Sequence, residues 1–251
     1  MATYALLLGA GLVAGAMNAI AGGGTFVVLP VLTLAGLPPT VANASTTVAL
    51  FPGTLASTWA YRRDIRPLEG ASNGVLLTLS LVGGLLGAVL LLFTPQRTFS
   101  AIIPWLLLVA TVTLAAGPRA PQLLRRMGLH VGGRSLYAAQ FLLGIYGGYF
   151  GGAVGLMMLA AWSLATTADL RTLTPLRTIM VAAANGIAVA CFALTGNVRW
   201  RETLIVMAGG AAGGYVGARL GWRLPGGALR VLILAVTVIT TSVFFLRAYL
   251  S

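Results

Sequence analysis

The first glycine-rich segment of the chain, from Asn18 to Thr25, has the residue types of an anion site. Three consecutive glycines, Gly22, Gly23 and Gly24, follow an apolar run. Glycine has no Cβ, so its backbone N–H can approach a ligand closely. A helix that begins near Thr25 would direct its dipole and its free N–H groups at the same point, and such helix N-termini bind anions. Asn18 and Thr25 can add neutral donors; the alternative is that the glycines only permit a tight turn and close packing.

A second glycine pair, Gly151 and Gly152, interrupts an apolar stretch in the other half of the chain. Tyr146 and Tyr149 precede it and could donate hydroxyl groups to an oxyanion. They are equally well explained as packing or interfacial aromatics.

Polar residues also lie inside two of the long apolar runs. Asn43, Ser45, Thr46 and Thr47 must face protein or a wet cavity if their run is in lipid, and interhelical hydrogen bonding explains them equally well. Arg177 begins an apolar run and could pair with the anion, because a guanidinium matches an oxyanion bidentately. Its alternative role is that of an interfacial arginine that reaches toward the membrane surface. Asn185 lies two turns further into the same run.

The composition requires that most of this chain be surrounded by lipid. Of its 251 residues 58% are hydrophobic and 8% charged, whereas soluble domains carry about 25% charged residues. Residues 1–61 carry no charge and as one helix would extend roughly 90 Å, about three hydrocarbon thicknesses. This run lacks a basic segment before it, so we interpret it as a retained membrane segment and not as a signal peptide.

The charged residues exclude several classes of function. All sixteen basic residues are arginines, the net charge is +12, and the arginines lie between apolar runs, which indicates membrane topology and lipid contacts and no nucleic-acid groove. One histidine, His130, and one cysteine, Cys191, cannot build a zinc site. We therefore predict no catalytic residue, metal or cofactor. The predicted partners are a small anion and the bilayer, and a homodimer is allowed.

The apolar runs are too long and too regular for strands, so the predicted fold is an all-α polytopic membrane protein. Residues 1–117 and 135–251 form two repeats joined by an arginine-rich connector, 118–134. Each repeat contains a short helical hairpin with a Gly-rich tip, then three transmembrane helices. The predicted hairpins are 4–36 and 135–167, and the predicted spans are 41–60, 71–93, 98–117, 174–195, 202–219 and 227–249.

Three matches in the same order support the repeat. Gly11–Gly15 corresponds to Gly144–Gly148, and Asp64–Arg66 to Asn197–Arg199, both at an offset of 133 residues. The pattern GGxxGA beginning at Gly83 returns at Gly213, an offset of 130, and predicts faces for close helix packing. Short Gly-interrupted segments at matching places in two repeats are typical of the binding sites of secondary transporters.

The arginines predict how the chain crosses the membrane. If each hairpin returns to its starting side, twelve of the sixteen arginines lie on the side of the connector; if each crosses once, the division is ten to six. Because positive charge stays in the cytoplasm, the first arrangement is favoured. It makes the two repeats inverted, the connector cytoplasmic and both termini periplasmic, in a bacterial inner membrane.

Two motifs in the first half, Gly15–Gly24 and Val41–Ser45, make the chain resemble the sulfite exporter TauE/SafE family, one of the TSUP transporters. Gly144–Gly155 and Gly196–Trp200 are similar to the second half of that family. The resemblance covers nearly the whole chain. It implies a polytopic transporter of sulfite, sulfonates or related sulfur anions.

The function expected from these features is secondary transport of a small sulfur-containing anion, bound at the midplane between the two Gly-rich breaks. Export is favoured because no Asp or Glu lies in the middle of a span to relay protons; Asp169 and Glu202 lie at span ends. The alternatives are an ion-coupled importer of an organic anion, a membrane enzyme, or an assembly protein without transport.

Overall fold

The computed structural model describes residues 2–68, 70–116, 119, 133–166, 170–221 and 226–249. Within these ranges the chain is all-helical, as the sequence predicts, and no strand is present. Most of the connector 118–134, with His130, and Asp169 lie outside the described residues. The helices are α1 (Ala2–Ala21), α2 (Thr25–Leu34), α3 (Pro39–Tyr61), α4 (Asn73–Phe93), α5 (Gln96–Ala116), α7 (Arg134–Tyr149), α8 (Val154–Ala165), α9 (Leu170–Leu194), α10 (Trp200–Gly221) and α11 (Gly226–Tyr249).

Four of the described helices are long and apolar enough to cross a membrane: α4, α5, α9 from Thr172 and α11 from Val231. These four helices make the chain a polytopic membrane protein. Two other long helices, α3 and α10, are not among them. Threonine, serine and asparagine side chains along α3 lower its hydropathy, and the site described below shows where several of these polar groups lie.

Each predicted hairpin region contains a helix break at its glycines. The chain turns at Gly22, with φ of +75°, between α1 and α2, and at Gly151, with φ of +79°, between α7 and α8. Ala153 has a φ of +58°, a left-handed conformation that alanine rarely adopts. α2 has ten residues and is about 15 Å long, half the thickness of a hydrocarbon core.

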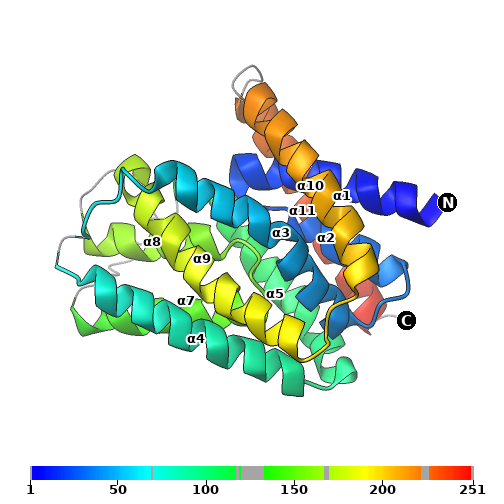
Figure 1. The fold of residues 1–251 in the computed structure, drawn as a ribbon, viewed down its shortest axis with the longest axis horizontal. Coiled ribbons are helices and arrows are strands. Elements are labelled where there is room, and N and C mark those ends of the chain that lie inside the picture. Colours follow the sequence, from blue (N-terminus) through cyan, green and yellow to red (C-terminus); the bar gives the residue numbers. More distant parts are fainter. Residues whose placement is uncertain are drawn as a thin grey trace.

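The two halves pack against each other reciprocally. α1 of the first half lies along α10 of the second, and α7 of the second half lies along α4 of the first (Figure 1). A Cβ on Gly87 of α4 would overlap the carbonyl oxygen of Ile145, and one on Gly213 of α10 would overlap that of Leu12. The GGxxGA segments therefore permit close helix packing, which confirms the sequence interpretation.

The core fills the space between the halves. Fully buried side chains include Phe26 on α2, Phe150 at the second break and Phe192 on α9. Both chain ends lie at one end of the bundle, on the right in Figure 1, and the loop between α3 and α4 lies at the opposite end. Because Phe26 follows the first break and Phe150 lies at the second, both breaks adjoin the packed core. Irregular backbone is tolerated at such places in a membrane protein.

Candidate functional site

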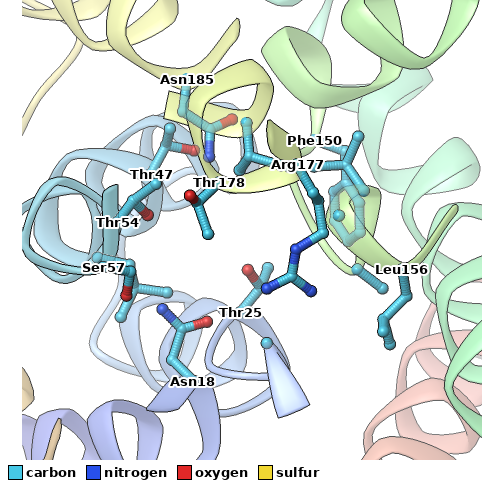
Figure 2. A pocket seen from close by; sticks show the side chains of 17 residues that line it. Asn18, Thr25, Thr47, Thr54, Ser57, Phe150, Leu156, Arg177, Thr178 and Asn185 are labelled. Carbon is cyan, nitrogen blue, oxygen red and sulfur yellow. The ribbon is translucent and has the colours of Figure 1, made fainter. Parts of the chain in front are cut away.

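Both helix breaks border one cavity of about 120 Å³. Asn18 at the end of α1, Gly22 in the first break and Thr25 at the start of α2 form one wall. The middle of α3 forms a second wall. The segment 150–156 and α9 close the cavity from the other half of the chain, and Figure 2 shows side chains from these elements arranged around an open centre.

Arg177 on α9 supplies the positive charge of this cavity. Its guanidinium points into the open centre, on the side of Thr25 (Figure 2). Among the described residues, the only ion pair joins Arg199 and Glu202, and no hydrogen bond involves the Arg177 guanidinium. No Asp or Glu is among the described residues that line the cavity. A half-buried guanidinium that has no counter-ion among the described residues favours an anionic ligand, because an unpaired charge in a protein interior is costly.

Two helix N-termini point backbone donors at the same region. Thr25 begins α2, and Val154 begins α8 after the left-handed Ala153. Within the described part of the chain, no group accepts a hydrogen bond from the backbone N–H of Thr25, Val154 or Gly155, and these residues line the cavity. Neither helix has a side-chain cap. The free N–H groups and the positive ends of the helix dipoles therefore add to the field of Arg177.

The hydroxyl groups of the cavity differ in what they can donate. Thr47, Ser57 and Thr178 donate to carbonyl oxygens on their own helices, at 3.1, 3.0 and 2.7 Å. The Thr54 hydroxyl makes no hydrogen bond to any described residue, so its proton is free for a ligand. Side-chain amides of Asn18 and Asn185 complete the polar lining. One cation with several neutral donors suits an ion of about one negative charge.

Six of the fourteen residues predicted to bind substrate line this cavity. They come from both halves of the chain: Asn18, Gly22, Thr25, Gly151, Arg177 and Asn185. The other eight lie elsewhere and have structural partners: Gly23, Gly24, Asn43, Ser45, Thr46, Tyr146, Tyr149 and Gly152.

Two of the tip glycines face away from the cavity. A Cβ on Gly23 would lie 3.3 Å from Met17 Cε and 3.7 Å from Ile233 Cγ2, within the apolar packing of α1 and α11. A Cβ on Gly24 would lie 2.9 Å from the carbonyl oxygen of Ala14. In the second break, a Cβ on Gly152 would lie 2.6 Å from the ring of Phe150. At these three positions glycine serves close packing.

The remaining predicted residues hold helices together. Asn43 donates to the carbonyl oxygen of Tyr149 at 2.9 Å, and Ser45 accepts from the backbone N–H of Arg199 at 3.1 Å. Thr46 donates to the carbonyl oxygen of its own helix at Ala42. Tyr146 donates to the carbonyl oxygen of Leu106, and Tyr149 to the hydroxyl of Thr94, each at 3.3 Å.

The sequence interpretation singled out Thr47 but missed the rest of a polar face on α3. Thr47, Thr54 and Ser57 line the cavity together with Leu50, at helical spacings of three and four residues. Residues at this spacing share one face of a helix. Their periodicity in the sequence was a usable signal, because three of the four are hydroxyl residues in an otherwise apolar span.

The family model for the sulfite exporter TauE/SafE family matches residues 7–244. The chain belongs to the sulfite exporter TauE/SafE family. It is 27% identical over 216 residues to a "Probable membrane transporter protein" of Haemophilus influenzae, a match that covers 86% of this chain and 84% of that protein.

Two further relatives show the same similarity over most of their length. The "Probable membrane transporter protein YfcA" of Escherichia coli K12 is 27% identical over 220 residues, 85% of this chain and 77% of that protein. The "Probable membrane transporter protein ORF9" of Sinorhizobium sp is 26% identical over 236 residues, with coverages of 93% and 89%. This TauE/SafE chain is therefore a multi-pass bacterial-type membrane transporter.

Proposed function

We propose that the chain carries a small sulfur-containing anion, such as sulfite or an organosulfonate, and that the cavity at Arg177 is its binding site. The observation that carries the proposal is the Arg177 guanidinium, which lies without a carboxylate partner among the described residues and between two uncapped helix N-termini. Paired helix breaks with a ligand between them are a known arrangement in secondary transporters. The volume of about 120 Å³ is more than a single water molecule needs, and it suits a small oxyanion head.

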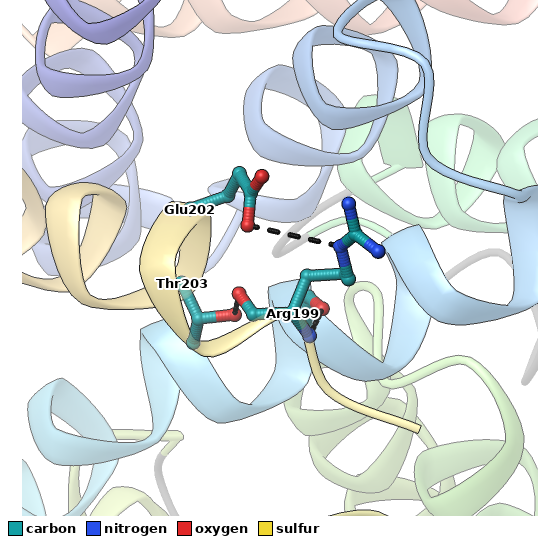
Figure 3. Close-up of polar contacts among 4 residues, drawn as sticks. Arg199, Glu202 and Thr203 are labelled. Atoms are coloured by element: carbon teal, nitrogen blue, oxygen red, sulfur yellow. Dashed lines mark hydrogen bonds and ion pairs between the residues drawn. The ribbon is translucent and has the colours of Figure 1, made fainter. Parts of the chain in front are cut away.

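We favour export as the direction. A potential of 100 mV, inside negative, favours expulsion of one negative charge by about 2.3 kcal/mol, roughly a 50-fold gradient, without any coupled ion. Proton coupling would need a titratable carboxylate near the substrate. Glu202 is not among the lining residues and lies 4.0 Å from Arg199, with which it forms an ion pair at the start of α10 (Figure 3).

An ion-coupled importer of an organic anion is the second candidate, and one observation favours it. The side-chain oxygens of Asn43 and Asn185 are buried and accept no hydrogen bond from any described residue. Backbone carbonyl oxygens coordinate Na⁺ at the broken helices of some transporters, and a side-chain amide oxygen is a neutral acceptor of the same type. A requirement for Na⁺ in transport would select this candidate over export driven by the membrane potential.

The proposed orientation places the connector 118–134 in the cytoplasm and both termini in the periplasm, in the inner membrane. The distribution of arginines supports it, and so does the position of both termini at one end of the bundle (Figure 1). Cysteine labelling at residues 2 and 125 tests it, and labelling of both positions from the same side would contradict the inverted repeat. The homodimer stays a prediction.

Binding is tested first in detergent, by thermal unfolding with sulfite, sulfate, thiosulfate, taurine and sulfoacetate. A ligand that binds only the native state raises the unfolding temperature by mass action. We expect sulfite or a sulfonate to stabilise the wild type and to have no effect on Arg177→Gln. Equal stabilisation of both proteins would place the anion site elsewhere.

A further inference from the structure

A second and larger cavity, of about 540 Å³, adjoins the anion cavity. It lies between α1, α3 and α10 and is lined mostly by small side chains, with Tyr61 and Tyr215 among the larger ones. Asn18, Leu50 and Ser57 line both cavities. The two cavities therefore lie next to each other and share these three residues in their lining.

The matching interface in the other half of the chain is closed. Gly84 of α4 and Gly214 of α10 are the second glycines of the two GGxxGA segments. A Cβ on Gly84 would lie 2.7 Å from Ala184 Cα, so α4 is in backbone contact with α9 there. A Cβ on Gly214 would meet only the carbonyl oxygen of Gly15, at 3.8 Å, and Gly214 lines the large cavity. The same motif thus closes one interface and leaves the other open.

Buried polar side chains join α4 to α7 and α8 in the same half of the chain. Gln140 on α7 donates to the hydroxyl of Ser80 on α4 at 2.8 Å and accepts from the indole N–H of Trp162 on α8 at 2.9 Å. All three side chains are at most 1% exposed. The residue that corresponds to Ser80 in the GGxxGA alignment is Gly210, and it lines the open cavity.

We propose that the large cavity is the route by which the anion reaches Arg177, and that the α4–α9 contact at Gly84 and Ala184 is the closed gate of the opposite route. This inference rests on the proposed function. In the alternate state the two halves exchange their arrangements: α10 approaches α3 near Gly214 and closes the large cavity, while α4 separates from α9 at Gly84. Both states keep the same anion site, so access alternates around it.

The proposed topology assigns a side to each route. The large cavity extends to Tyr61 at the end of α3, next to Arg62 and Arg63 on the cytoplasmic side of the topology. The structure is then the inward-open state, in which an exporter loads its anion from the cytoplasm. The gate at Gly84 and Ala184 lies near the middle of α4 and α9, and the fully buried Ala188 lies one turn further along α9 toward the periplasm.

The first test fills the large cavity without touching the proposed anion contacts. Ala211 on α10 lines this cavity but not the anion cavity. We expect Ala211→Trp to reduce transport in proteoliposomes at least tenfold, because the indole prevents α10 from approaching α3, and to keep the thermal stabilisation by sulfite. The matched control is Leu204→Trp on the same helix, at an exposed position that lines neither cavity. Wild-type transport by Ala211→Trp would overturn the inference.

The second test measures access directly, with single cysteines in a Cys191→Ser background. Ala56→Cys lines the large cavity, and Ala188→Cys replaces a fully buried side chain on the periplasmic side of the Gly84–Ala184 contact. A membrane-impermeant methanethiosulfonate should modify Ala56→Cys from the cytoplasmic side and leave Ala188→Cys unmodified in the absence of substrate. Sulfite on the periplasmic side should raise the modification rate of Ala188→Cys from the periplasm and lower that of Ala56→Cys.

These measurements distinguish a failure of the access inference from a failure of the proposed function. If sulfite changes the modification rate of neither cysteine but still raises the unfolding temperature of the wild type, the access inference is wrong and the proposed anion site is retained. If sulfite and the sulfonates bind to no form of the protein, the proposed function itself fails.

Discussion

The stem of Arg177 packs against Gly155, at the start of the helix that follows the second break. A Cβ at Gly155 would lie 3.2 Å from Cδ of Arg177 and 3.6 Å from its Nε. The absence of a side chain at Gly155 is thus what lets the guanidinium extend into the anion cavity. One glycine of the second half sets the position of the only cation found among the described residues that line this site.

Gly155→Val should therefore displace the guanidinium without removing its charge. We expect sulfite to bind about tenfold more weakly, a loss of about 1.4 kcal/mol, while the protein still inserts and folds. Titration of the unfolding temperature with sulfite measures the change. Gly74→Ala is the control, because a Cβ there would meet only the Ser72 hydroxyl, at 3.8 Å. An unchanged affinity in Gly155→Val would show that Arg177 need not occupy this position.

Thr54 should contribute to binding through its free hydroxyl proton. Thr54→Val keeps the shape of the side chain and removes the donor, and hydrogen bonds to charged groups contribute about 1.5–3 kcal/mol. We expect at least about a tenfold loss of sulfite affinity. Thr47→Val is the matched control, because Thr47 lines the same cavity but already donates its proton to Asn43. Equal losses in both variants would mean that the cavity does not use the Thr54 donor.

The contact between the halves should depend on Gly213. A Cβ there would overlap the carbonyl oxygen of Leu12, so Gly213→Ala must push α10 away from α1. Overpacking of this kind typically costs about 1–3 kcal/mol, and we expect a lower unfolding temperature in detergent. On the facing helix, a Cβ on Gly9 would meet no atom within 4 Å, so Gly9→Ala should leave the unfolding temperature unchanged. Similar behaviour of the two variants would contradict the close packing of α1 and α10.

The sequence predicted the helical fold because lipid imposes strict rules on apolar runs and broken helices. It also identified Asn18, Thr25, Arg177 and Asn185, each of which is polar in an apolar context, and all four line the cavity. It did not separate Gly22 from Gly23, because which glycine faces a cavity depends on the turn between α1 and α2. Nor could it show that Asn43 and Ser45 hold Tyr149 and Arg199, since these bonds join residues 106 and 154 positions apart.

The large cavity could not be predicted from the sequence, for a related reason. Gly84 and Gly214 occupy the same place in the same motif, yet one is in backbone contact with Ala184 and the other lines the cavity. Identical local sequence is compatible with both arrangements, and the conformation of the whole bundle decides between them.

The central claim, that the Arg177 cavity carries the transported anion, is tested most directly by sulfite flux in proteoliposomes under an imposed potential. We predict that the wild type moves sulfite toward the positive side without a Na⁺ or pH gradient, and that Arg177→Gln lowers the rate at least about 30-fold, as loss of a charged partner implies. Arg177→Lys keeps the charge and should retain part of the rate. Wild-type flux by Arg177→Gln would contradict the account.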